Sequence, residues 1–285
     1  MAEKEDIYTK KDVELLEKEI RDLKDQAKVK DEFIRMTNHE LRTPLDIIRG
    51  NLDMVLKGES GEIPTTTREY LVDALFGADR LTGLVDDMLD IARITTGQMR
   101  FKLEEIILCD LLETVVKEFS PIAKDKRLVL YLECFKDIPP VYSDRSRLFQ
   151  IMDNLIGNAF KFTPRGGSIT MRVTDDRNGN IPDTVVVSVV DTGGGIKSED
   201  LQKLFKQFPD IEKHVQPTEK GTGLGLNLVW HLLKALGDDI WAESAGFGKG
   251  TTFSFRLPIA GSERAKQLHN YHEIYLKSKN DNPIN

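Results

Sequence analysis

The sequence predicts an α+β protein, in which a helical N-terminal part is followed by an α/β two-layer sandwich with a mixed sheet. Up to about residue 97 the apolar residues recur at the spacing of amphipathic helices, whereas beyond Phe101 short strand-like runs alternate with helical segments. A length of 285 residues favours about two domains. We therefore expect a coiled-coil helix over residues 1–32, a helical domain over 33–97, an α/β domain over 101–260, and a polar tail over 261–285 that is part helix and then disorder.

The composition is that of a soluble globular protein and narrows the classes of partner. Hydrophobic residues make up 40% of the chain and charged residues 31%, which is enough apolar material for a core. The net charge of −7 argues against a general affinity for nucleic acid. Cys109 and Cys134 have no metal-ligand spacing, so we expect two reduced thiols. No run of 18 apolar residues occurs, so we expect no membrane contact within this chain and a cytoplasmic protein, or the cytoplasmic part of a membrane receptor.

A long helix is predicted from about residue 10 to 57. Its first part has the 3-4 alternation of a heptad seam, interrupted by one polar residue, at Val13, Leu16, Ile20, Leu23, Ala27, Lys30 and Ile34. This pattern favours a short parallel coiled coil that runs directly into residues 33–45. A solvated single helix that pairs with nothing is the alternative.

A second helix is predicted from about Thr66 to Thr95, after a turn at Gly58–Pro64. Its heptad pattern consists of Leu71, Leu75, Ala78, Thr82, Val85, Leu89 and Ala92. Two amphipathic helices joined by a short loop form an antiparallel hairpin that leaves apolar stripes exposed. Two copies would bury these stripes in a four-helix bundle, so we predict a homodimer through residues 33–95.

The most informative stretch of the first helix lies around His39. Glu40 follows it directly, and Thr43 lies four residues on, one turn away on the same helix face. Imidazole is a nucleophile, a neighbouring carboxylate can take its proton, and a hydroxyl can hold a water. A histidine, an acid and a hydroxyl so arranged are suited to a phosphoryl relay.

The domain after Phe101 is predicted to alternate strands and helices. Asp144 is placed to cap the helix that follows it. The expected strands are Phe101–Leu108, Leu128–Glu133, Ser168–Thr174, Thr184–Asp191, Asp239–Glu243 and Thr251–Leu257, and the expected helices are Asp110–Asp125, Arg145–Lys161 and Gly223–Leu236.

Polar side chains on one face of the helix 145–161 suggest a phosphate and metal site. Asn154, Asn158 and Lys161 lie at i, i+4 and i+7. Asparagine is unfavourable inside a helix, so a pair on one face needs a reason. A neutral oxygen ligand for Mg²⁺ and a lysine that meets phosphate provide one. A merely solvated polar face is the alternative.

Two glycine-rich segments complete the pattern. Asp191 ends a strand beside Gly193 and Gly195, where a carboxylate can accept a hydrogen bond from an adenine amino group. Gly221-Thr222-Gly223-Leu224-Gly225 opens a helix, and free N–H groups there bind anions. A dinucleotide fingerprint would need a strand directly before these glycines, whereas residues 209–220 form a polar loop.

Together these motifs resemble those of two-component sensor histidine kinases. The run Asn38-His-Glu-Leu-Arg-Thr-Pro-Leu45 resembles the family's phospho-acceptor motif, with Asn38 in place of its serine. Residues 153–163 resemble the N-box, and Asp191–Gly195 and Gly221–Gly225 resemble the two glycine boxes. The resemblance covers about residues 30–258. It implies a gyrase-type ATP-binding domain that acts on a dimeric acceptor hairpin.

The resemblance also implies roles for individual residues. Asn158 would ligate Mg²⁺, Asn154 and Lys161 would lie near the phosphates of ATP, Phe162 near the adenine, and Asp191 would bind the adenine amino group. Glu40 would take the proton of His39, the phosphoryl group would pass to the receiver domain of a response regulator, and Thr43 would orient a water for a phosphatase mode. Residues 205–220 would form a lid, in which the family's arginine is missing after Phe205-Lys-Gln-Phe208. The alternatives are a gyrase- or chaperone-type ATPase and a degenerate kinase that acts as a phosphatase or dimeric scaffold.

Overall fold

The computed structural model describes Lys18, Met36 and residues 40–135, 137–177, 181–201, 204 and 224–280, with side chains up to 273 in the last range. Apart from Lys18, the predicted coiled coil over 1–32 lies outside these residues. The chain divides into two compact units, Met1–Met99 and Arg100–Asn285. Each unit is described by itself.

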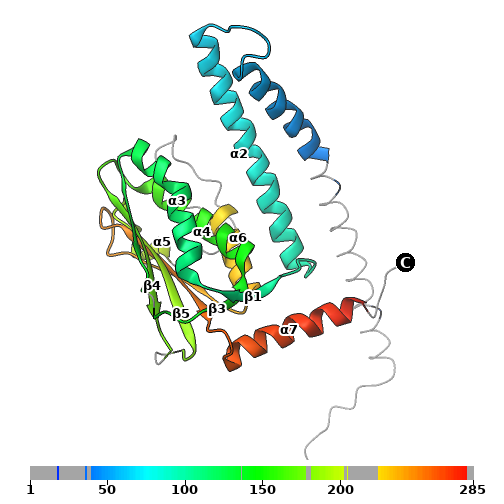
Figure 1. Cartoon of the computed structure of the whole chain (residues 1–285), viewed down its shortest axis with the longest axis vertical. Helices are drawn as coiled ribbons and strands as arrows, with labels where there is room; N and C mark the ends of the chain where they lie inside the picture. Colours follow the sequence, from blue (N-terminus) through cyan, green and yellow to red (C-terminus); the bar gives the residue numbers. More distant parts are fainter. Residues whose placement is uncertain are drawn as a thin grey trace, which may run out of the picture. The chain divides into compact units, whose positions relative to one another are not determined.

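The first unit contains the predicted helical hairpin (Figure 1). The described part of its first helix covers residues 40–56, and α2 spans Thr65–Thr95. Gly58 and Gly61 in the connecting turn have φ angles of 87° and 96°, a region that glycine enters without steric cost. Four residues of the predicted heptad pattern are buried in α2, namely Ala78, Val85, Leu89 and Ala92.

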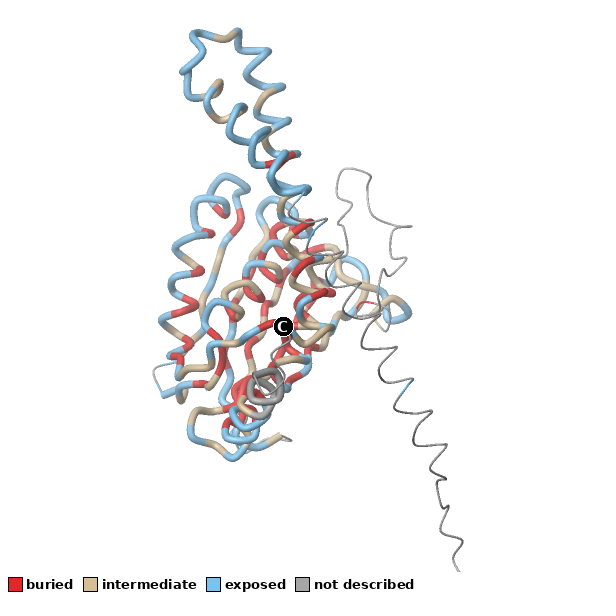
Figure 2. Tube along the Cα trace, turned by 90° about the vertical axis from the view of Figure 1, so that its right-hand side faces the viewer, coloured by how far each residue is buried: buried red, intermediate tan, exposed pale blue. Residues whose placement is uncertain are grey.

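Much of the hairpin is exposed to solvent. Figure 2 shows the hairpin largely in the colour of exposed residues. The exposed side chains include large apolar ones on both helices: Leu41, Ile47, Ile48, Met54, Val72, Phe76, Leu81 and Met88. A hairpin with so much uncovered apolar surface is incompletely buried by its own chain.

The second unit is an α/β two-layer domain, and the predicted fold class is confirmed. Its five-stranded sheet has the order β2-β4-β5-β7-β6, in which β2 and β4 are parallel and the other neighbours antiparallel. The strands are β2 (Val129–Glu133), β4 (Ser168–Asp175), β5 (Thr184–Asp191), β6 (Ile240–Glu243) and β7 (Thr251–Pro258). The helices α3 (Leu108–Lys126), α4 (Arg145–Phe162) and α6 (Leu224–Ala235) lie together on one side of the sheet (Figure 1).

The core lies between these helices and the inner face of the sheet. Alternate residues of β4 and β5 are buried, as expected for strands that cover a core on one side. Asp144 caps α4 as predicted, because its Oδ1 accepts hydrogen bonds from the backbone N–H groups of Ser146 at 2.9 Å and Arg147 at 3.1 Å. The cap fixes where α4 begins and therefore which of its faces meets the core.

Some short elements differ from the prediction. Val141–Asp144 (β3) pairs antiparallel with β1 (Leu103–Ile106) as a separate two-stranded sheet, and Ser198–Leu201 forms a one-turn helix, α5. The tail was expected to be part helix, and residues 263–280 form α7 (Glu263–Asn280). Ala265, Leu268 and His272 of α7 are buried, so the helix is held by packing against the domain.

The expectation of two reduced thiols is also wrong in this structure. Cys109 in the first turn of α3 and Cys134 just after β2 form a disulfide, with their Cα atoms 5.7 Å apart. The cysteines are 25 residues apart in sequence, and the contact of α3 with β2 brings them together. Sequence spacing could not show this pairing.

Candidate functional site

The site is centred on Asp191, the last residue of β5. The residue is 7% exposed, and its Oδ1 accepts hydrogen bonds from the backbone N–H groups of Gly193 at 2.7 Å and Thr251 at 3.2 Å. Burial raises the pKa of the Asp191 carboxyl group, while the two backbone N–H groups oppose that rise. No described residue donates a hydrogen bond to Oδ2. The fold therefore holds Oδ1 of the Asp191 carboxylate in place through two backbone N–H groups.

The glycine turn after Asp191 packs against the end of α4. A Cβ on Gly193 would lie 2.4 Å from the carbonyl oxygen of Phe162, and the N–H of Gly194 donates to the same oxygen at 3.2 Å. Gly195 has a φ of 66° and lies against Gly246, in the loop before β7. Because Gly193 and Gly195 have no side chains, the turn can contact both the end of α4 and the loop before β7.

The predicted polar face of α4 lies next to this turn. Asn154 and Asn158 are half-buried, and the Asn154 Nδ2 donates to the Gln150 carbonyl at 3.0 Å. The Lys161 Nζ lies 4.8 Å from the centre of the Phe162 ring, which is 40% exposed. Amide oxygens, a lysine ammonium and an exposed ring are therefore presented near the end of one helix.

The start of α6 meets the same face of α4. A Cβ on Gly225 would lie 2.3 Å from the Asn154 Oδ1, so the backbone of α6 closely approaches that side chain. Leu224 is the first residue of α6. Gly221, Thr222 and Gly223 lie outside the described residues, as does most of the predicted lid over 205–220.

The arrangement offers an acceptor at one end and a helix N-terminus at the other, with polar groups of α4 between them. Helix N-termini attract phosphate, and asparagine oxygens can share a Mg²⁺ ion with phosphate oxygens. Within the described residues no cluster of three or more His, Cys, Asp or Glu side chains has the geometry of a metal site.

Sequence reasoning assigned no role at the site to two residues that hold it together, although Thr251 begins a predicted strand. The N–H of Thr251 fixes the Asp191 carboxylate. The Ser244 hydroxyl accepts from the Ile196 N–H at 3.0 Å and donates to the Gly250 carbonyl at 2.7 Å, which joins the glycine turn to the loop before β7. The position of Thr251 follows from the strand register, because Asp191 pairs with Thr251. No local sequence motif marks Ser244.

The acceptor motif is only partly described. Glu40 and Thr43 lie on the first helix of the hairpin with exposed side chains, three residues apart, and His39 lies outside the described residues. No helix in the described part of the chain has the length and hydrophobicity needed to cross a membrane.

Comparisons with known proteins match both units. Residues 143–261 match the model of the histidine kinase-, DNA gyrase B- and HSP90-like ATPase family, and residues 29–97 match the His Kinase A (phospho-acceptor) domain. The non-motile and phage-resistance protein of Caulobacter vibrioides is 36% identical over 83% of this chain and 28% of its own length. The chain thus spans well under half of that relative.

Two solved structures are similar over most of the chain. Full-length ShkA in complex with AMPPNP is 29% identical with a TM-score of 0.65, over 81% of this chain and 47% of ShkA. The histidine kinase ThkA in complex with the response regulator protein TrrA is 24% identical with a TM-score of 0.56, over 85% of this chain and 66% of that structure. At this identity the likeness to ThkA concerns the fold.

The α/β unit therefore belongs to the class of gyrase- and HSP90-like ATPase domains. Because a phospho-acceptor hairpin precedes that domain in the same chain, the protein belongs to the sensor histidine kinase family.

Proposed function

We propose that this chain is the catalytic core of a two-component sensor histidine kinase, which transfers the γ-phosphoryl group of ATP to His39. One observation in the α/β unit supports this most directly. The start of α6 at Gly225 packs closely against Asn154 of α4, and the end of α4 contacts the glycine turn that follows Asp191. A nucleotide site of this kind, together with a histidine motif on the hairpin, favours phosphoryl transfer to protein over simple ATP hydrolysis.

Within this proposal each polar group has a separate task in binding ATP. The Oδ2 of Asp191 accepts a hydrogen bond from the adenine amino group, and the exposed Phe162 ring packs beside the base. Asn158 contributes an oxygen to Mg²⁺, which offsets phosphate charge when bound. Asn154, Lys161 and the N-terminus of α6 position the phosphates. Positioning and charge compensation supply most of the rate in phosphoryl transfer.

On the hairpin, Glu40 accepts the imidazole proton as His39 attacks the γ-phosphorus. The phosphoryl group then passes to an aspartate in the receiver domain of a response regulator. In a separate phosphatase mode, Thr43 orients a water that hydrolyses this aspartyl phosphate and releases inorganic phosphate. The homodimer through residues 33–95 would cover the exposed apolar side chains of the hairpin.

The base assignment is tested with Glu40→Gln in the full chain. Autophosphorylation should fall by about 10²-fold or more, the usual contribution of a general base, while binding of Mg²⁺-AMPPNP stays unchanged. Glu69→Gln is the matched control, because Glu69 is an exposed acid on α2. Unchanged phosphorylation of His39 in the Glu40 variant would show that Glu40 is not the base.

One experiment separates the alternatives. Phosphate fixed on protein indicates a kinase, whereas free phosphate released at equal rates by the parent and by His39→Ala indicates an ATPase of the gyrase or chaperone type. Nucleotide binding without either product indicates a degenerate kinase that acts as a phosphatase or scaffold.

A further inference from the structure

The helix α7 lies beyond the part of the chain that matches the ATPase family, which ends at residue 261. Its composition is polar, yet Ala265, Leu268 and His272 are buried. These residues are three and four apart and therefore lie on one face of the helix. A helix that buries one face in this way is docked on the domain and is more than a solvated extension.

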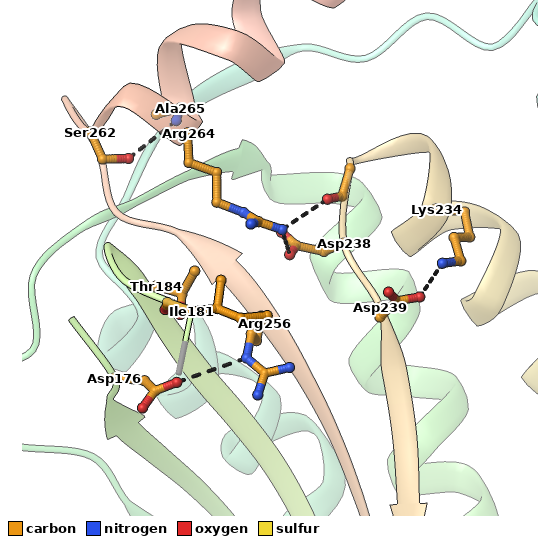
Figure 3. A network of polar contacts seen from close by, with 11 residues as sticks. Asp176, Ile181, Thr184, Lys234, Asp238, Asp239, Arg256, Ser262, Arg264 and Ala265 are labelled. Atoms are coloured by element: carbon orange, nitrogen blue, oxygen red, sulfur yellow. Dashed lines mark hydrogen bonds and ion pairs between the residues drawn. The ribbon is translucent and has the colours of Figure 1, made fainter. Parts of the chain in front are cut away.

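The first turn of α7 is fastened to the turn between α6 and β6 (Figure 3). The Arg264 Nη2 lies 2.6 Å from the Asp238 Oδ1 and donates to the Gly237 carbonyl at 3.1 Å. The Asp238 side chain is 2% exposed, and Arg264 is half-buried. Ser262 accepts from the Ala265 N–H at 3.1 Å and so caps the start of the helix. The contact is therefore charged, largely desolvated and made by a well-defined helix end.

Further along, α7 holds the last residue of α6. The His272 Nε2–H donates to the Ala235 carbonyl at 3.2 Å, and the His272 ring lies 5.1 Å from that of Phe101. Burial lowers the pKa of His272, which favours the neutral ring. His269 shares a hydrogen bond of 2.8 Å with the Tyr142 hydroxyl on β3. These contacts, spread along α7, connect it to the C-terminal end of α6 and to neighbouring segments of the unit.

The opposite end of α6 is the nucleotide end. The helix has 12 residues, so it is about 18 Å long, and Gly225 at its start contacts Asn154 of the polar α4 face. A packed helix moves as a rigid body, so fixing its C-terminal end restricts the position of its N-terminal end.

We propose that α7 is a positioning clasp for α6, in which Arg264 and His272 hold the C-terminal end of α6 so that its N-terminus is placed for the phosphates of a bound nucleotide. This inference rests on the proposed nucleotide site. Arg264 is a positioning residue, since it acts through Asp238 and α6. Coupling between two sites is reciprocal, so nucleotide binding must strengthen α7 docking by the same factor by which docking strengthens nucleotide binding.

The first arm of the test measures hydrogen exchange of the full chain with and without Mg²⁺-AMPPNP. Saturating nucleotide should slow exchange of the backbone amides of residues 265–273 by about 5-fold or more, the lower end of typical coupling. Slower exchange at the nucleotide site with unchanged exchange in α7 would overturn the clasp. A parent protein that binds no nucleotide would overturn both the proposed function and the clasp.

The second arm compares Arg264→Ala with Lys266→Ala, an exposed lysine on the same helix that pairs with Glu263. The Arg264 variant should bind Mg²⁺-AMPPNP about 5-fold or more weakly, with Lys266→Ala unchanged and Arg264→Lys partly restored. Combining Arg264→Ala with Asp238→Asn should add little further loss of affinity. If α7 had a purely structural role, Arg264→Ala would lower the melting temperature and leave the Kd for Mg²⁺-AMPPNP unchanged. That result would overturn the proposal, even if one variant folded poorly.

Discussion

Replacing Gly225 with alanine tests the geometry of the nucleotide site directly. The new Cβ would lie 2.3 Å from the Asn154 Oδ1, whereas ordinary contact begins at 3.4 Å, so α6 or Asn154 must move by about 1.1 Å. A displacement of about 1 Å at a catalytic site can cost on the order of 10²-fold in rate. We expect nucleotide affinity to fall about 10- to 100-fold. Overpacking should also cost about 1–3 kcal/mol of stability, of which helix propensity recovers up to about 1 kcal/mol.

The affinity is measured by calorimetric titration of the full chain with Mg²⁺-AMPPNP, and the stability by urea denaturation. Gly157→Ala is the matched control, because Gly157 is exposed on α4 and its added Cβ meets nothing within 4 Å. That variant should gain about 0.5–1 kcal/mol in stability and keep its affinity. Equal nucleotide affinity for the parent and Gly225→Ala would refute the view that the Asn154 contact places α6 for binding.

Three further predictions concern single groups in the second unit. Asp191→Asn should weaken nucleotide binding by about 10- to 100-fold, since a hydrogen bond to a charged group contributes about 1.5–3 kcal/mol; an unchanged Kd by calorimetry would remove Asp191 from the adenine site. Burial raises the pKa of Asp238 from 3.8 to about 6. The folded state therefore favours the protonated carboxyl group, and the stability that this preference contributes is fully present below about pH 4 and is lost as the pH rises through 6. Between pH 4 and 7 the free energy of unfolding of the parent should therefore fall by about 2 kcal/mol relative to Asp238→Asn, and parallel pH profiles in urea denaturation would contradict this. Reducing the Cys109–Cys134 disulfide, which closes a loop of 25 residues, should lower the free energy of unfolding of the second unit by about 3 kcal/mol, whereas equal urea midpoints with and without dithiothreitol would show that the bond contributes nothing.

The sequence predicted those elements whose signals are local. Asp144 marks the start of α4 because a short acidic side chain before a helical run satisfies free backbone N–H groups. Five of the eight residues of β5 are valine, and the strand was predicted with its observed bounds, Thr184–Asp191. The helix α2 was predicted from its heptad pattern to within one residue of its observed start. In each case the residues that determine the element are its own.

The missed elements depend on distant partners. The strand β3 has four residues and is completed by pairing with β1, so the preceding prolines suggested only a loop. A partial helix was predicted in the tail, but the burial of Ala265, Leu268 and His272 on one of its faces depends on the domain against which α7 packs. The disulfide depends on the contact of α3 with β2, which no cysteine spacing encodes.

The candidate site divides in the same way. Asn154, Asn158 and Asp191 could be proposed as site residues from motifs, because each motif lies within one helix or turn. The contacts that join them, such as Thr251 to Asp191 and Gly225 to Asn154, require the sheet register and the packing of α6 on α4. The sequence therefore proposed the candidate residues, and the fold determines how they are arranged.

The most direct test of the proposed function is incubation of the full chain with γ-labelled ATP and Mg²⁺, beside His39→Ala. The gel conditions must preserve acid-labile, base-stable phosphate. Label on the parent and none on the variant is the predicted result, and it would identify a histidine kinase with His39 as acceptor. Equal label on both proteins, or none on the parent although it binds ATP, would contradict phosphoryl transfer to His39.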